Sequence, residues 1–326
     1  MPYQWPPKDK DEVTVILWPG TKIKARIKVE KLIGGRERTM LNPILDREPL
    51  PEDVRCKSCG SARLYRHGFT AAGVQRYKCR ECKLTFIGTD TLPRMRIPVA
   101  MVGAAVSLFY EGLSLNAIRR QMNQIYGIYP SDSTVYDWVV RFTKTAVKIS
   151  DGYTPKVGQV WTADETVLKV GGQNTWFWDC IDEDTRFLLA SHLTPSRFTR
   201  DAETLMRRAL DKAGRPPRVI VTDKLRSYLD GIERVFGADA RHVQSGPFKL
   251  DMSTRSIERF HGTLKDRTKV MRGMANRETA KLVMEGWLVH YNYLRPHMGL
   301  GKRTPAEAAG LIVPFKTWAE VVRMEL

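Results

Sequence analysis

The chain has 326 residues, of which 42% are hydrophobic and 27% charged, which is typical of a soluble globular protein. At about 150 residues per domain, this length predicts two or three domains. No run approaches the ~20 uncharged apolar residues of a membrane helix, the N-terminus is too polar for a signal peptide, and five cysteines are too few for a secreted disulfide scaffold. We therefore expect a cytoplasmic protein with no membrane partner.

The charge of the chain is strongly positive. Lysine and arginine number 53 against 36 aspartates and glutamates, which gives a net charge of +17. Because a soluble protein this basic most often binds a polyanion, nucleic acid is the expected partner. The alternative is a merely basic enzyme of the cytosol.

The first 54 residues predict a β-hairpin followed by a linker. Apolar residues alternate over 13–29, with Pro19-Gly20 between the two runs, as in two strands joined by a turn. The polar face of the second strand is basic, which suits either phosphate contacts or, as we prefer, a solvated strand protected from aggregation. Residues 31–54 contain Gly34-Gly35 and three prolines and are interpreted as a linker.

Residues 55–90 contain four of the five cysteines in two C-x-x-C pairs. Nineteen residues separate the pairs, which are Cys56 with Cys59 and Cys79 with Cys82. Two such turns supply the four sulfur ligands of a tetrahedral Zn²⁺ site, so the pattern predicts a zinc ribbon with one structural zinc. A redox pair and chance spacing are the alternatives, but the spacing and the absence of a thioredoxin-like context favour zinc.

Residues 97–150 predict three helices. Ser114 and Ser131 stand where N-caps are expected, and Gly127 ends the second helix. Three short helices with a tight turn before the last resemble a helix-turn-helix DNA-binding domain, although an ordinary three-helix bundle has the same pattern. In a helix-turn-helix the last helix would face DNA through Ser133, Thr134, Arg141 and Lys144.

The rest of the chain, about 156–310, predicts an α/β domain, because three strands are followed by a helix, a strand and further helices. Three carboxylates stand out within it. Asp164 lies inside the first strand, where a carboxylate needs a cation or hydrogen bonds. Asp223 ends the fourth strand, the usual position of ligand groups in such sheets. Glu258 lies in a helix that starts near Ser253. Taken singly, Asp164 could be a hydrogen-bonded strand residue, Asp223 a helix cap and Glu258 a solvated helix residue.

The helix of Glu258 is amphipathic. Glu258, Lys265, Lys269 and Arg272 are spaced close to whole turns and share one face, beside an apolar stripe. Such a helix can bury its stripe on the sheet and present a carboxylate followed by cations. The cations are candidates for contacts with DNA phosphates.

These motifs resemble those of DDE transposases of bacterial and archaeal insertion sequences, and of retroviral-type integrases. Asp164 in WTADETVLKV, Asp223 in VIVTDK and Glu258 in RSIERFHGTLKDRTK look like the D-D-E triad of these enzymes, and 34 residues separate the last two. The segment HYNYLRPHMGLGKRTPAEAAG is also similar. The ribbon followed by a helix-turn-helix is similar to the DNA-end-binding regions of such transposases.

The resemblance implies an RNase H-like core, a mixed five-stranded sheet with flanking helices, in which Asp164, Asp223 and Glu258 hold two Mg²⁺ or Mn²⁺ ions. It implies a transposase that binds the terminal repeats of its element, cleaves the strands and joins them to target DNA, as a homodimer or larger assembly at the nucleoid. Tyr291, Asn292, Arg295 and His297 look like the end of the core, and 311–326 like a C-terminal helix or tail. A catalytically inactive zinc-dependent DNA-binding regulator and an RNase H-type nuclease are the alternatives.

Overall fold

The structure is a computed structural model. It describes residues 50, 54–69, 75–88, 90–92, 95–245, 254–271 and 274–325 with their side chains, and the backbone of 12–17, 21–31 and 37–44. The chain divides into two compact units, Met1–Gly88 and Thr89–Leu326.

The N-terminal residues form a small antiparallel sheet. Strands β1 (Glu12–Leu17) and β2 (Thr21–Lys31) pair as the predicted hairpin, whose turn lies outside the described residues. The linker prediction for 31–54 is wrong in part, because Glu37–Ile44 forms strand β3 on the other edge of β2. Glycines and prolines nearby obscured this strand in the sequence, whereas the free backbone groups along the edge of β2 favour pairing.

The predicted ribbon is a second small sheet, of β4 (Leu64–Phe69), β5 (Gln75–Cys79) and β6 (Thr85–Ile87) in antiparallel order. Its core contains only a few side chains, among them Leu64, Tyr77 and Phe86, together with two of the cysteines. A core this small usually needs a metal for independent stability, which agrees with the interpretation of the cysteines.

The second unit contains a mixed five-stranded sheet in the order β11-β10-β7-β8-β9. Its strands are β7 (Val160–Val170), β8 (Gln173–Asp182), β9 (Leu188–Thr194), β10 (Val219–Thr222) and β11 (Arg241–Gln244). Strand β10 runs parallel to β7 and β11, and β7, β8 and β9 are antiparallel. The expected RNase H-like arrangement, with the first and fourth strands as neighbours, is confirmed. The short polar strand β11 gave no apolar alternation to predict it.

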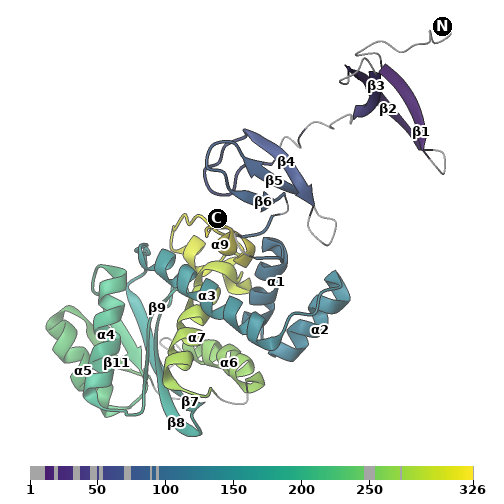
Figure 1. Ribbon diagram of the computed structural model, residues 1–326. Helices are drawn as coiled ribbons and strands as arrows, with labels where there is room; N and C mark the ends of the chain where they lie inside the picture. The colour runs from purple at the N-terminus through teal and green to yellow at the C-terminus, as the bar shows by residue number, and fades with distance from the viewer. Residues whose placement is uncertain are drawn as a thin grey trace. The chain divides into compact units, whose positions relative to one another are not determined.

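Helices cover both faces of this sheet (Figure 1). On one face lie α4 (Thr199–Ala213) and α5 (Arg226–Phe236), and on the other α6 (Arg255–Val270) and α7 (Arg277–Val289). The apolar stripe predicted for α6 is buried through Ile257, Phe260 and Leu264. Burial of this stripe fixes which side chains of α6 meet the sheet.

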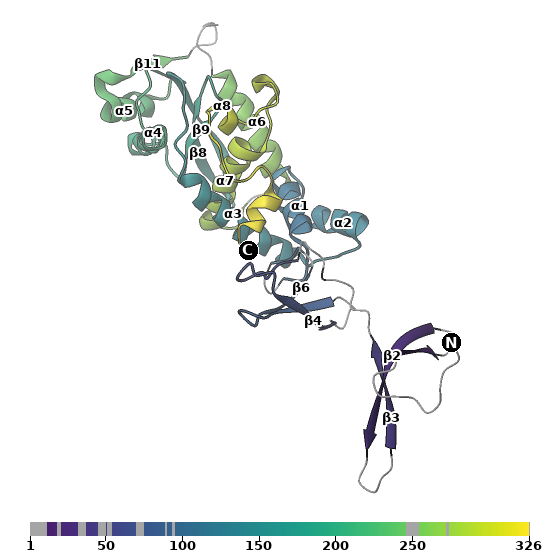
Figure 2. The ribbon, with the colours of Figure 1, turned by 90° about the horizontal axis from the view of Figure 1, so that it is seen from above.

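The predicted three helices are α1 (Val99–Tyr110), α2 (Leu115–Tyr126) and α3 (Asp132–Asp151). The side chains of Ser114 and Ser131 accept the expected capping hydrogen bonds, and Gly127 ends α2 in a left-handed conformation. The helices share one continuous core with the sheet, because α3 packs on α7 and α1 on the C-terminal helix α9 (Trp318–Arg323), seen beside α1 in Figure 2.

Short elements complete the unit. They are the 3-10 turns Gly237–Asp239 and Met298–Leu300, the π-helical turn His290–Leu294 and α8 (Pro305–Ala308). Of the helices that the structure describes, none has the length and apolar character to cross a bilayer.

Candidate active site and metal centres

Asp164 lies in β7, and Asp223 directly follows the neighbouring strand β10. Strands β7 and β10 run parallel with Thr162 opposite Val221, and each aspartate follows one of these two residues by two positions. One carboxylate oxygen of Asp164, one of Asp223 and one of Glu165 lie within 4.8 Å of one another. All three residues are half-buried. This group of oxygens is of the kind that Mg²⁺ prefers.

Glu165 is the member that the sequence did not suggest. It faces α4 and α5, where the Tyr228 hydroxyl donates to it at 3.0 Å and Arg197 forms an ion pair with it. Burial, and next the charge of Asp223, raise the pKa of Glu165. Asp164 and Glu165 are consecutive residues of β7, yet one oxygen of each lies within 4.8 Å of an oxygen of Asp223, which directly follows β10.

Asp223 also caps the turn into α5. Its Oδ1 accepts a hydrogen bond from the backbone N–H of Leu225 at 2.8 Å, so the capping interpretation applies to one oxygen. In the part of the chain that is described, no hydrogen bond engages Oδ2. A capping role therefore leaves one oxygen of this carboxylate for a cation.

Asp164 is held by a buried histidine on α6. The Nδ1 of His261 lies 3.5 Å from Asp164, and its Nε2 lies 3.1 Å from Asp179, the residue opposite Asp164 on β8. Burial acts to lower the pKa of His261, but the hydrogen bonds and charges of the two aspartates raise it to about 9. Burial raises the pKa of Asp179 to about 6. This Asp179–His261 pair orients Asp164, and no sequence pattern indicated the pair.

Glu258 lies one turn before His261 on the same helix, with its side chain exposed. Its carboxylate accepts a hydrogen bond from the Thr254 hydroxyl at 2.7 Å and is not among the three clustered acids. The structure thus brings the helix of Glu258 to Asp164, and the role of its carboxylate stays a prediction.

The basic residues predicted on α6 divide into two groups. Lys265 and Lys269 are exposed and, with Lys169 from β7, line an open cavity of about 560 Å³. Arg272 lies outside the described residues. Arg267, in contrast, is buried, with its guanidinium carbon 3.9 Å from the centre of the Phe109 ring.

The residues predicted to face DNA lie along α3. Ser133 and Thr134 are in its first turn, where both hydroxyls bond to Ser131. Arg141 is partly exposed but forms an ion pair of 2.6 Å with Glu325 near the C-terminus. Lys144 is exposed. Of the two predicted DNA-facing cations, Arg141 and Lys144, Arg141 is therefore paired with a carboxylate in this structure.

The four ribbon cysteines converge. Their sulfur atoms all lie within 4.8 Å of one another, with Cys56 3.4 Å from Cys82 and Cys59 3.6 Å from Cys79. Burial opposes ionisation of Cys79, but the backbone N–H groups of Cys82 and Glu81 lower its pKa to about 7. Four converging sulfurs of this kind could hold one tetrahedral Zn²⁺.

Comparison with known proteins gives two family matches. Residues 158–297 match the DDE domain of IS240-type transposases, and residues 53–83 match the N-terminal, zinc-ribbon domain of InsA. No curated protein matches.

The fold is also similar to retroviral integrases of known structure. The catalytic core of HTLV-2 integrase, determined with magnesium, is 15% identical, and the similarity covers 48% of this chain and 99% of that one with a TM-score of 0.38. The core of BIV integrase is 17% identical over 47% and 93% of the two chains, with a TM-score of 0.35. A simian T-cell lymphotropic virus intasome chain is 12% identical over 66% and 77%, with a TM-score of 0.39.

Proposed function

Because the chain carries a DDE transposase domain of the IS240 type and an InsA-type zinc ribbon, we propose that it is a transposase that binds the terminal repeats of its insertion sequence, cleaves them and joins them to target DNA. The observation that carries this proposal is the convergence of Asp164 and Asp223 from adjacent parallel strands. The net charge of +17 supports DNA as the substrate.

The acidic site fits a pair of divalent cations. Asp164 and Asp223 offer oxygens within 4.8 Å of each other, and in the described residues Oδ2 of Asp223 has no hydrogen bond. We propose that Glu258, which accepts a hydrogen bond from Thr254, completes the set, in keeping with the spacing of 34 residues. Bound Mg²⁺ or Mn²⁺ would supply an activated oxygen nucleophile and stabilise the leaving oxygen at phosphorus.

The surrounding residues have distinct parts in this proposal. Asp179 and His261 orient Asp164, so that its carboxylate is fixed before DNA binds. Lys265 and Lys269 contact phosphates of the DNA end beside the acidic site. The ribbon, with one Zn²⁺ on its four cysteines, and the start of α3 contact the terminal repeat.

The test is cleavage and joining of labelled DNA from the flanks of the reading frame, with Mg²⁺ or Mn²⁺. Asp164→Asn and Asp223→Asn should each abolish both reactions and leave DNA affinity within about twofold, because each removes a cation ligand and no DNA contact. Asp211→Asn, an exposed aspartate of α4, is the matched control.

The third carboxylate is decided by comparing Glu258→Gln with Glu165→Gln. The proposal expects Glu258→Gln to abolish cleavage and Glu165→Gln to retain it. The opposite result would assign the third ligand to Glu165. Cleavage that ignores the terminal repeats would indicate a nuclease instead, and binding without any cleavage would indicate a regulator.

A further inference from the structure

A basic pocket lies on a different side of α6 from Glu258 and the exposed lysines. Its volume is about 310 Å³, and it is enclosed by α6, by the turn between β8 and β9, and by the segment that follows the π-helical turn. Ser256 and Thr263 of α6 line it, and at 100° per residue they lie roughly 150° around the helix from Glu258. These residues therefore lie on a different side of α6 from Glu258, and Arg259, which also lines the pocket, lies about 100° around the helix from Glu258.

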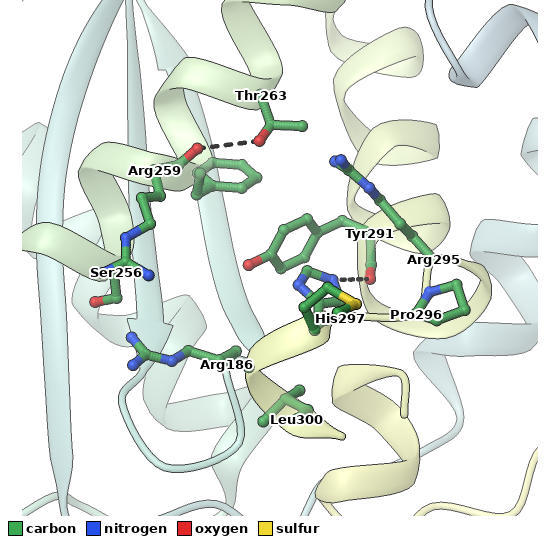
Figure 3. Close-up of a pocket in the computed structure, with 12 residues that line it drawn as sticks. Arg186, Ser256, Arg259, Thr263, Tyr291, Arg295, Pro296, His297 and Leu300 are labelled. Atoms are coloured by element: carbon green, nitrogen blue, oxygen red, sulfur yellow. Dashed lines mark hydrogen bonds between the residues drawn. The ribbon is translucent and has the colours of Figure 1, made fainter. Parts of the chain in front are cut away.

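Three arginines from distant parts of the chain meet in this pocket. They are Arg186 from the β8–β9 turn, Arg259 from α6 and Arg295 from the end of the π-helical turn (Figure 3). Arg186 forms an ion pair of 2.9 Å with Glu183. In the described part of the chain neither Arg259 nor Arg295 has an ion pair, although the charge of Arg295 acts on Glu111 and helps to lower the pKa of that carboxyl.

The wall between these arginines is aromatic. The Tyr291 ring lies edge-on to His297 at 4.5 Å and to Phe260 at 5.0 Å, and Figure 3 shows it between Arg259 and Arg295. Burial is the main cause that lowers the pKa of His297, so its ring is neutral at pH 7. Burial raises the pKa of Tyr291 to about 12, which keeps its hydroxyl protonated. The pocket thus combines a neutral, rigid wall with planar cations at its edges.

Such a combination matches the backbone of a DNA strand. Guanidinium groups bind phosphate oxygens through paired N–H donors, and such contacts position a protein on the DNA backbone. Two arginines on opposite sides of one ring, neither with an ion pair among the described residues, suit successive phosphodiesters better than one small anion.

We propose that this pocket, built from Arg186, Arg259, Arg295 and Tyr291, binds the sugar–phosphate backbone of a DNA strand and forms a second DNA contact on the far side of α6. The proposal rests on the proposed function, since it assumes a DNA substrate.

The test measures DNA affinity of the full, zinc-loaded chain by fluorescence anisotropy of a short labelled duplex over a range of salt concentrations. The double variant Arg259→Ala, Arg295→Ala should bind about tenfold more weakly at ~0.1 M salt, and its salt slope should fall by about 0.9 for each phosphate that the variant no longer binds. Arg207→Ala, Arg234→Ala, which removes two exposed arginines from α4 and α5, is the control for the same change in net charge.

A second variant separates phosphate binding from folding. Arg259→Lys, Arg295→Lys keeps both charges, so it should keep the salt slope while losing the part of the affinity that depends on paired donors. Thermal unfolding of each variant shows whether it is folded. If the alanine variant is unfolded, weaker DNA binding by a folded lysine variant supports the pocket.

Equal affinity and salt slope for Arg259→Ala, Arg295→Ala and for the control Arg207→Ala, Arg234→Ala would overturn the pocket while leaving the transposase proposal intact. Inorganic phosphate could raise the unfolding temperature of the unmodified chain but not that of Arg259→Ala, Arg295→Ala, while both bind DNA equally well. This result would overturn the DNA contact and assign the pocket to a small anion. Failure of the unmodified chain to bind DNA would overturn both proposals.

Discussion

Arg267 is a basic residue of α6 that we expect to affect the stability of the fold rather than the binding of DNA. It lies on α6 among exposed cations, yet only 2% of it is exposed. None of its three side-chain nitrogens has a hydrogen-bond partner among the residues that the structure describes, and it packs against the face of Phe109 at 3.9 Å. Burial lowers the pKa of Arg267 from 12.5 to about 10.

This depression of the pKa corresponds to a penalty of about 3 kcal/mol on the charged form, at 1.36 kcal/mol per pKa unit. A desolvated cation–π contact stabilises the charged form by about 2 kcal/mol. Arg267→Met keeps a long flexible chain against Phe109 without the charge, so the free energy of unfolding should be unchanged or rise by about 1 kcal/mol. Arg267→Ala also removes the packing of the side chain against Phe109, so it should lower the free energy of unfolding by about 2 kcal/mol.

Urea unfolding followed by tryptophan fluorescence and circular dichroism measures both variants, with Arg207→Ala as the exposed control on α4. A decrease of more than about 2 kcal/mol for Arg267→Met would refute the reasoning, because it would mean that the guanidinium has a strong polar partner.

Two further predictions concern the zinc ribbon and the exposed Lys265 and Lys269 of α6. Metal analysis should find about one zinc per native chain and none in the double variant Cys56→Ser, Cys59→Ser, since two sulfurs cannot hold the ion; a zinc-free native chain would contradict the ribbon site. Lys265→Ala, Lys269→Ala should lower the salt slope of DNA binding by about 0.9 for each phosphate left unbound; an unchanged slope would show that these lysines face solvent in the complex.

The local features of the fold follow from the sequence. The spacing of the cysteines predicted the ribbon, and Ser114, Gly127 and Ser131 predicted the ends of helices that the structure shows. These features are local, because a cap or a C-x-x-C turn depends on residues three or four positions apart. Asp223 was predictable for the same reason, as a carboxylate where a strand ends.

Features that depend on tertiary packing were not predictable. Arg267 belongs by helical position to a basic helix, and its burial against Phe109 of α1 depends on tertiary packing. The bond between Arg141 and Glu325 joins residues from α3 and the C-terminus. His261 could have been singled out as a titratable residue three positions after Glu258, but nothing in the sequence indicates that Asp179 meets its other nitrogen.

The most direct test of the acidic site replaces one ligand oxygen by sulfur. Asp223→Cys should be inactive in DNA cleavage with Mg²⁺, which binds thiolate poorly, and should regain activity with the more thiophilic Mn²⁺. Recovery with Mn²⁺ but not with Mg²⁺ would show that the side chain at this position binds the catalytic cation. Full activity of this variant with Mg²⁺ would contradict the proposed site, because cleavage would then not depend on the Asp223 carboxylate.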